Sequence, residues 1–320
     1  MKLALAGDTM LGRGVAEALV SGGPQPLADE VVEVAAEADL FMLNLECCIS
    51  ERGEPWPAAG KPFFFRAPPH AAEVLAQAGV DCVTLANNHA LDFGERALLD
   101  TFAYLEAAGI QWVGAGRDLA AARAPRRLSA GGEVLLVVAL SDHPRDFAAA
   151  PDRAGIGFAD LRRGAPDWVV EAVTGAAAAG TVLVSPHWGP NMTSAPLAYV
   201  RRAAGQLRSA GAALVAGHSA HVFHGAERGV LYDLGDFLDD YRVDHVLRND
   251  LGLLFLITID NARATRLEAV PLKLDYCHTR LAAGEDAAWV RERFASACEA
   301  LGTAVEVSDH RVVASLDAGP

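Results

Sequence analysis

The chain has 320 residues, of which 52% are hydrophobic and 21% charged, and its net charge is −14. This acidic balance argues against a nucleic-acid partner, because phosphate backbones bind to basic surfaces. No segment approaches the roughly 20 consecutive apolar residues that cross a bilayer, and the N-terminus lacks the pattern of a secretory signal. Five cysteines without a CxxC pair indicate reduced thiols. The sequence therefore predicts a cytoplasmic protein without a membrane span.

Short apolar segments alternate with Ala-rich amphipathic ones through the first two thirds of the chain. This alternation predicts strands at 3–6, 40–44, 81–86, 111–113, 133–140, 181–185 and 213–216. The intervening helices are predicted at 14–20, 27–38, 69–78, 95–108, 166–179 and 196–210, with a long loop at 48–69. Strands joined by helical crossovers favour right-handed βαβ units and a largely parallel sheet.

The pattern changes near Gly225. Residues 230–234, 252–260 and 264–274 read as consecutive strands with tight turns, which is typical of antiparallel pairing. A helix is predicted at 286–301. Because no repeat or linker interrupts the chain, we expect a single domain over 1–320 with a helical C-terminal extension at about 285–320.

Polar residues of metal-ligand type follow five of the predicted strands. They are Asp8, Glu46, Asn88, His187, and His218 with His221. The carboxyl ends of strands border the ligand crevice of α/β sheets, so these side chains can converge there. An aspartate after a strand is commonly only a helix cap, but the joint pattern indicates a metal site. Carboxylates with neutral imidazoles suit one or two divalent ions, Mn, Zn or Fe above all.

The same segments resemble a known family. They read Gly7-Asp-Thr-Met-Leu-Gly-Arg13, Asn44-Leu-Glu46, Lys61-Pro-Phe-Phe-Phe-Arg66, Ala86-Asn-Asn-His-Ala-Leu-Asp-Phe-Gly94, Val113-Gly-Ala-Gly116, His187-Trp-Gly189 and Gly217-His-Ser-Ala-His-Val222. In this order they are similar to the CapA family, named for poly-γ-glutamate capsule biosynthesis, within the calcineurin-like metallophosphoesterase superfamily. The resemblance implies a four-layer α/β/β/α sandwich, in which two central mixed sheets are flanked by helices and carry a dimetal site.

The resemblance also implies roles for individual residues. Asp8 matches the first-strand carboxylate ligand, Glu46 the bridging carboxylate and Asn88 the amide ligand, while His187, His218 and His221 match the later histidine ligands. His89 matches the adjacent catalytic histidine, and its ordinary pKa near neutrality suits a general acid. Candidates for substrate binding are Arg13, Arg66, Asn87 and Trp188.

The sequence departs from the family pattern in ways that concern the metal. Met10 stands where a histidine ligand is usual, so that occupancy by a single ion becomes an alternative to two. Two residues separate His218 from His221. Asp236 replaces an amide, and it is assigned here a catalytic role, with an added ligand or a partner to a histidine as alternatives. The family's usual membrane anchor is not expected in this chain, because no segment of the sequence has its pattern.

Together these features predict a metal-dependent hydrolase of the CapA-like metallophosphatase type. It would act on a phosphoester or an amide or peptide-like substrate through metal-activated water, with His89 protonating the leaving group. One alternative is a biosynthetic enzyme that ligates or epimerises a peptide or polyglutamate. Another is a non-catalytic polymer-binding module. The expected partner is an anionic small molecule or peptide, and the sequence carries no indication of the oligomeric state.

Overall fold

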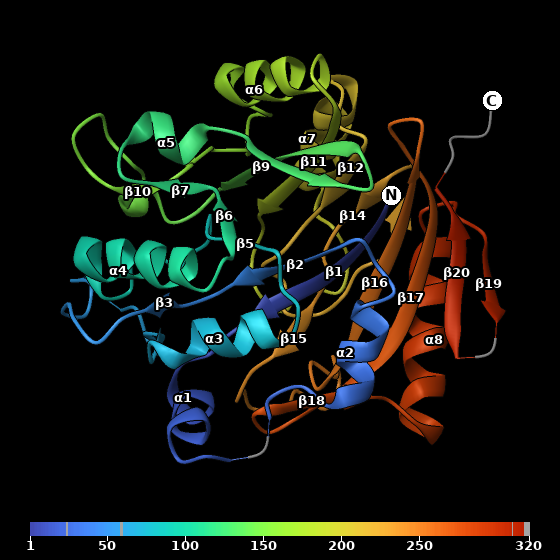
Figure 1. The fold of residues 1–320 in the computed structure, drawn as a ribbon. Coiled ribbons are helices and arrows are strands. Elements are labelled where there is room, and N and C mark those ends of the chain that lie inside the picture. Colours follow the sequence, from blue (N-terminus) through green and yellow to red (C-terminus); the bar gives the residue numbers. More distant parts are fainter. Residues whose placement is uncertain (24, 58–59, 309, 317–320) are drawn as a thin grey trace.

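A large mixed sheet forms one half of the molecule (Figure 1). The computed structural model describes residues 1–23, 25–57, 60–308 and 310–316. The parallel strands of this first sheet are β1 (Lys2–Thr9), β2 (Leu40–Leu45), β5 (Cys82–Thr84) and β6 (Gln111–Val113). Antiparallel strands β16 (Leu251–Asp260), β17 (Arg263–Asp275), β20 (Arg311–Ser315) and β19 (Val305–Ser308) extend it beyond β1. In addition, β15 (Asp236–Leu238) pairs in parallel with β1, and β18 (His278–Leu281) pairs with β17.

A second sheet packs against the first. Its order is β13 (Ala226–Glu227), β14 (Val230–Leu231), β12 (Leu214–Ala216), β11 (Thr181–His187), β9 (Glu133–Ser141) and β8 (Arg126–Ala130). The four strands between the two edges are mutually parallel. Two further pairs of short strands join β7 (Ala115–Gly116) to β10 (Gly155–Ile156) and β3 (Cys48–Ile49) to β4 (Arg66–Ala67).

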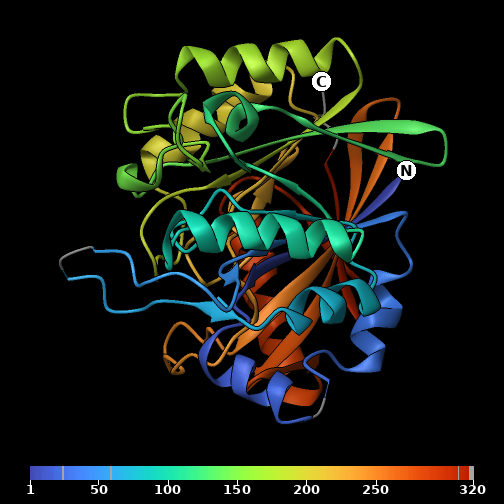
Figure 2. The ribbon, with the colours of Figure 1, turned by 60° about the vertical axis from the view of Figure 1, so that its left-hand side comes forward.

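Helices cover the outer faces of both sheets. Against the first sheet lie α1 (Arg13–Val20), α2 (Asp29–Ala35), α3 (His70–Gln77) and α4 (Gly94–Ala107). Against the second lie α6 (Asp167–Ala177) and α7 (Ala198–Ser209), seen at the top of Figure 1. The short helices α5 (Leu119–Arg123) and η1 (Arg145–Phe147) stand in connections. Figure 2, turned by 60°, shows α4 in front of the first sheet and α6 above the second. The expected four-layer α/β/β/α sandwich is confirmed.

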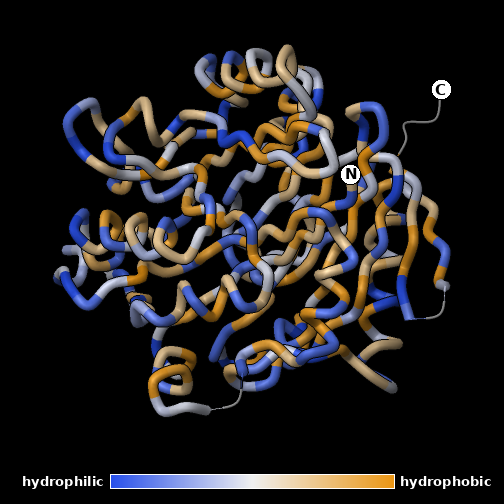
Figure 3. Tube along the Cα trace, in the orientation of Figure 1, coloured by the Kyte–Doolittle hydropathy of each residue, from blue (hydrophilic) through white to orange (hydrophobic). Residues whose placement is uncertain are grey.

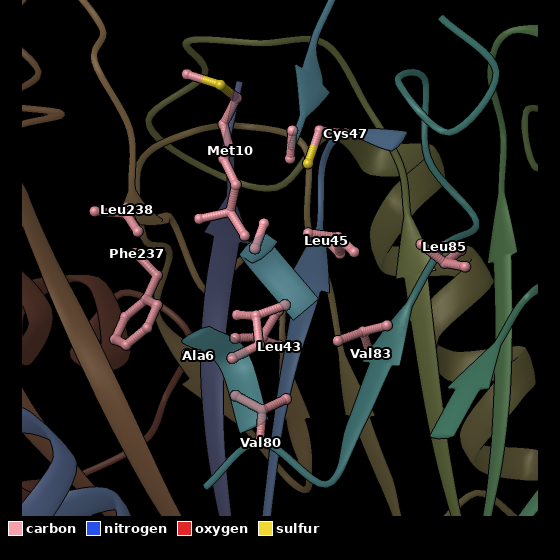
Figure 4. Packing of buried hydrophobic residues seen from close by; sticks show 14 of the residues in the cluster. Ala6, Met10, Leu43, Leu45, Cys47, Val80, Val83, Leu85, Phe237 and Leu238 are labelled. Atoms are coloured by element: carbon pink, nitrogen blue, oxygen red, sulfur yellow. The ribbon is translucent and has the colours of Figure 1, made fainter. Parts of the chain in front are cut away.

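Alternation along the strands builds these layers. In β1, Leu3 and Leu5 enter the cluster between the sheets, whereas Ala4 and Ala6 pack against the helices of the first sheet. In β9, Val137 faces the other sheet and Val138 faces the outer helices. Successive side chains of a strand point to opposite faces, so strands buried on both faces read as continuous apolar runs. The hydropathy colouring of Figure 3 and the packed side chains of Figure 4 show this apolar interior.

The C-terminal region differs from the expectation of a helical extension to residue 320. Helix α8 (Gly284–Glu299) ends early, and the hairpin of β19 and β20 follows and adds to the edge of the first sheet. The alternating pattern of Arg311–Ser315 explains the strand, because Val312 and Ala314 are buried while Arg311, Val313 and Ser315 are not. Among the helices of the described residues, none is both long and apolar enough to cross a bilayer.

Candidate metal centre

Six ionisable side chains from the ends of strands gather at one edge of the two sheets. Asp8 is the last residue but one of β1, Glu46 follows β2 and Asp236 begins β15, all in the first sheet. In the second sheet, His187 ends β11, and His218 and His221 follow β12. The parallel bridge between His187 and His218 holds these two segments side by side. All six residues are at most 7% exposed.

Asp8 lies at the centre of this group. Its Oδ1 is 3.1 Å from Nδ1 of His218, and its Oδ2 is 3.5 Å from Nδ1 of His221. Two sets of three residues bring their ligand atoms within 4.8 Å of one another, namely Asp8 with Glu46 and His187, and Asp8 with His221 and Asp236. Asp8 is common to both sets, whereas the resemblance implies Glu46 as the bridging carboxylate.

A close backbone crossing sets the position of Asp236. The amide of Asp8 donates to the carbonyl of Gly235 over 2.8 Å, and Asp8 and Asp236 are register partners in β1 and β15. A Cβ atom on Gly7 would lie 1.8 Å from the oxygen of Gly235. Only glycine permits this approach, which is what places the two carboxylates side by side.

Several buried oxygens of the centre lack a hydrogen-bond partner in the part of the chain that the structure describes. Among the described residues, no hydrogen bond reaches either carboxylate oxygen of Glu46, Oδ2 of Asp236 or Oδ1 of Asn88. Leaving such a group unsatisfied costs about 1–3 kcal/mol, and more when it is charged. Oxygen and imidazole donors around a shared carboxylate are the ligands that a divalent cation of the Mn, Zn or Fe type takes. The residues present therefore fit such an ion.

The electrostatics of the centre point to an excess of buried negative charge. Burial, followed by the charge of Asp8, raises the pKa of Glu46 well above its usual value. Burial also raises the pKa of Asp236, to about 6, against the opposing effect of His221. For His221, burial lowers the pKa, but the charge and hydrogen bond of Asp236 outweigh it and raise the pKa well above the usual value. A bound cation would offset this excess of charge.

An amide network behind the centre orients Asp8. Asn44 donates from Nδ2 to Oδ1 of Asp8 over 2.8 Å, and its own Oδ1 accepts from Thr84 and Asn87 at 2.9 and 3.0 Å. Asn87 is 0% exposed, and its Oδ1 accepts from the amide of His89. The side chain of Asn87, which is predicted to contact substrate, bonds inside the fold. Asn44 was not singled out in the sequence, although it stands in the same motif as Glu46.

His89 is held by a buried carboxylate. Its Nδ1 is 2.6 Å from Oδ2 of Asp92, whose Oδ1 pairs with Nζ of Lys61 at 2.7 Å. The imidazole also lies against Phe65, with ring centroids 4.1 Å apart. Burial lowers the pKa of His89, although Asp92 acts to raise it. Asp92 and Lys61 were not proposed from the sequence, yet both stand in the motifs that carry the family resemblance. Lys61 also donates to the carbonyl of Asn88 over 2.6 Å.

The arginine candidates differ in their surroundings. Arg13 pairs with Asp240 at 2.8 Å, and its guanidinium lies over Phe63, Phe65 and Tyr241 at 5.3 to 5.9 Å from the ring centroids. Because Tyr241 also contacts His221, with ring centroids 5.4 Å apart, Arg13 belongs to the rim of the centre. Arg66 stacks on Phe93 at 4.2 Å and donates to the carbonyls of Arg52 and Gly53.

Two further residues are buried within the fold. Trp188 is 2% exposed and donates from Nε1 to the carbonyl of Tyr232 over 2.9 Å. Trp188, which is predicted to contact substrate, therefore supports the second sheet through this bond. Met10 is 1% exposed and belongs to the apolar cluster beside β1, as Figure 4 shows.

A second histidine–carboxylate pair stands beside His187. Asp142 accepts from Nδ1 of His143 at 2.5 Å and from the hydroxyl of Tyr199 at 2.9 Å. The ring of His143 lies 5.2 Å from that of His187 and its side chain is one-third exposed. His143 was not predicted, although it follows β9 much as His187 ends β11.

Comparisons with known proteins agree with the sequence motifs. The model of the family described as "Bacterial capsule synthesis protein PGA_cap" matches residues 2–241. A probable polyglutamine synthesis accessory protein of Mycobacterium tuberculosis is 31% identical, over 90% of this chain and 88% of that protein. The PGA biosynthesis protein CapA of Bacillus subtilis is 25% identical, over 86% of this chain and 74% of that protein.

The solved structures that match this chain are more distant in sequence. A putative 5'-nucleotidase from Staphylococcus aureus has a TM-score of 0.48 and 13% identity, covering 92% of this chain and 58% of that one. A hypothetical protein from Thermus thermophilus has a TM-score of 0.46 and 17% identity, covering 85% of this chain and 99% of that one. The family match and the relatives, not these distant structures, decide the assignment. The chain belongs to the bacterial capsule synthesis protein family PGA_cap.

Proposed function

We propose that this protein is a metal-dependent hydrolase that cleaves an amide bond in a carboxylate-bearing, peptide-like substrate. The observation that carries the proposal is the set of unpartnered buried oxygens on Glu46 and Asp236 around Asp8. Asp8, Glu46 and His187 would hold one divalent ion, and Asp8, His221 and Asp236 a second. Such ions supply Lewis acidity and lower the pKa of bound water.

The chain's own residues account for the remaining chemistry. Asp92 accepts from Nδ1–H of His89, so Nε2 is free to take a proton from the attacking water and to deliver it to the leaving group. Asn44 fixes the orientation of the Asp8 carboxylate. Arg13, anchored by Asp240 among aromatic rings, is suited to hold an anionic group of the substrate.

The relatives support an amide substrate over a phosphoester. One is named for accessory work in polyglutamine synthesis and another for PGA biosynthesis. An amide-linked glutamate chain matches these names and presents the carboxylates that Arg13 can bind. A simple phosphoester carries negative charge, but it lacks the amide bond that the names of the relatives imply.

The test is hydrolysis of a γ-linked glutamate oligomer by the purified chain. Exhaustive chelation should abolish the cleavage, and Mn²⁺ or Zn²⁺ should restore it. Glu46→Gln should lower kcat about 100-fold, since one carboxylate of the centre is lost. Glu33→Gln, an exposed substitution on α2, is the matched control and should leave kcat unchanged. Full activity after chelation would refute the proposal.

A second candidate keeps the centre but changes the reaction. Because the relatives are named for synthesis, the chain could instead exchange a Cα proton or join glutamate units. Reaction in D₂O separates the two. Deuterium at Cα of intact oligomer, or a lengthened oligomer in the presence of ATP, would favour the biosynthetic reaction, whereas cleaved products without such label favour hydrolysis.

A further inference from the structure

A pocket rich in arginine lies along α7, at the edge of the second sheet. Its walls come from α7 and from the hairpin of β13 and β14, and its volume is about 540 Å³. The residues that line it are Arg201, Arg202, Gly205, Arg208, Glu227, Arg228, Val230 and Tyr232. Four arginines thus share one hollow in a chain whose net charge is −14. This pocket has no part in the centre proposed above.

The positive charge of the pocket is largely uncompensated. Glu227 is its one carboxylate among the described lining residues, and it already pairs with Arg201 at 3.2 Å and accepts from the hydroxyl of Tyr232 at 2.7 Å. Within the described part of the chain, Arg202 and Arg208 bond only to the carbonyls of Arg162 and Ala212. Three of the four guanidinium groups therefore have no carboxylate partner among these residues.

Arg208 shows the electrostatic consequence. It is half-buried against the backbone of Gly229, and burial together with the charge of Arg263 lowers its pKa. A guanidinium in this position gains from any anion that enters the pocket, because arginine binds carboxylates through two parallel hydrogen bonds. The geometry of the hollow and the missing counter-charge thus both point to an anionic ligand that carries carboxylates.

The length of the pocket indicates a ligand with several charges. Arg201 and Arg208 stand two helical turns apart, which is about 10 Å along α7. One small anion cannot span that distance. The overall negative charge of the protein does not prevent binding, because salt screens charges beyond about 8 Å at physiological ionic strength.

We propose that this arginine pocket is a docking site for a polycarboxylate chain, separate from the metal centre. The choice of a glutamate polymer over other polyanions rests on the proposed function. The pocket would hold part of a long substrate while another part reaches the metal centre. It would therefore favour polymers over short fragments.

The experiment measures binding of a fluorescein-labelled γ-glutamyl decamer by anisotropy, with the full chain in EDTA so that metal ligation does not contribute. The double variant Arg202→Glu with Arg228→Glu should weaken binding about tenfold or more. The matched control, Arg96→Glu with Arg127→Glu, makes the same change of charge on α4 and β8 and should weaken it less than about twofold. Hydrolysis of a γ-glutamyl dipeptide, too short to reach the pocket, should be equal in all three proteins.

Two outcomes would overturn the proposal. One is equal binding of the decamer by the pocket variant and its control in EDTA. This outcome includes the case in which no protein binds the decamer in EDTA and binding requires Mn²⁺. The other is equally strong competition by a single-stranded oligonucleotide of the same charge, which would make the pocket a general polyanion site. Failure of hydrolysis alone would leave the decamer binding intact, so the two proposals can fail independently.

Discussion

Some side chains of the centre could be recognised from the sequence, and others could not. Asp8, Glu46, His187 and His218 could be found because each directly ends or follows an apolar run, and parallel strands bring such positions together. The supports could not be found in this way. Asn44 acts by orienting Asp8, and Asp92 acts by holding His89 and pairing with Lys61. Sequence spacing does not reveal such contacts.

The pair of His89 and Asp92 makes a prediction about leaving groups. Asp92→Asn removes the charged acceptor at Nδ1, so the imidazole is no longer fixed with its proton on that atom. We expect kcat for amide cleavage to fall about 100-fold. The loss should be much smaller for a γ-glutamyl nitroanilide, whose leaving group needs less assistance from an acid.

Comparing these two substrates separates catalysis from structure. A variant that was merely misfolded would lose activity on both by the same factor. Equal losses on the amide and the anilide would therefore contradict the role assigned to His89. Lys61→Met keeps Asp92 but removes its ion pair. This variant should also lose more activity on the amide than on the anilide, by a smaller factor.

Most helices and most central strands of the two sheets were predictable from the sequence. The long strands and helices of the sandwich follow from periodicity, and β6 matches its predicted range residue for residue. Two-residue strands such as β3 and β4 are too short to show a periodicity. The sequence predicts a loop over these residues, so the pairing of the two strands was not predicted. The hairpin of β19 and β20 was missed because its edge strand is mostly exposed and reads as polar coil.

Helix α8 should be essential to the core between the sheets. Phe294 on this helix is 0% exposed, and its ring lies 5.7 Å from that of Phe255 and 6.3 Å from that of Phe223. We expect Phe294→Ala to reduce the free energy of unfolding by about 3–5 kcal/mol. Urea unfolding followed by circular dichroism measures it. Glu292→Ala, an exposed control on the same helix, should change it by less than about 0.5 kcal/mol. A loss below about 1 kcal/mol for Phe294→Ala would mean that α8 docks only loosely.

At the scale of the whole molecule, the four-layer architecture was predictable and the burial of its charge was not. Family resemblance and alternation together gave the layers, whereas the net charge of −14 says nothing of where the acids lie. The structure buries Asp8, Glu46, Asp233, Asp236 and Asp239 in one region. Burying like charges without counter-ions costs stability.

This buried charge predicts strong coupling between metal binding and stability. At a Mn²⁺ concentration of about 100 times Kd, binding should add about 2.7 kcal/mol, which is about 4 °C in Tm for a chain of this size. Differential scanning calorimetry with and without EDTA measures the shift. In Glu46→Gln the shift should shrink, while the chelated protein should melt higher than chelated wild type, because an unpartnered buried carboxylate has gone. A chelated variant that melts lower would contradict this account.

The division of the centre between two sheets has a consequence for the folding reaction. Asp8 and Glu46 belong to the first sheet and His187 and His218 to the second, so no single sheet contains a complete set of ligands. Contacts between residues so far apart in the chain form late, after the loops between them have closed. A cation can therefore bind tightly only once both sheets have docked. It should slow the unfolding rate of the finished molecule and leave the rate of folding almost unchanged.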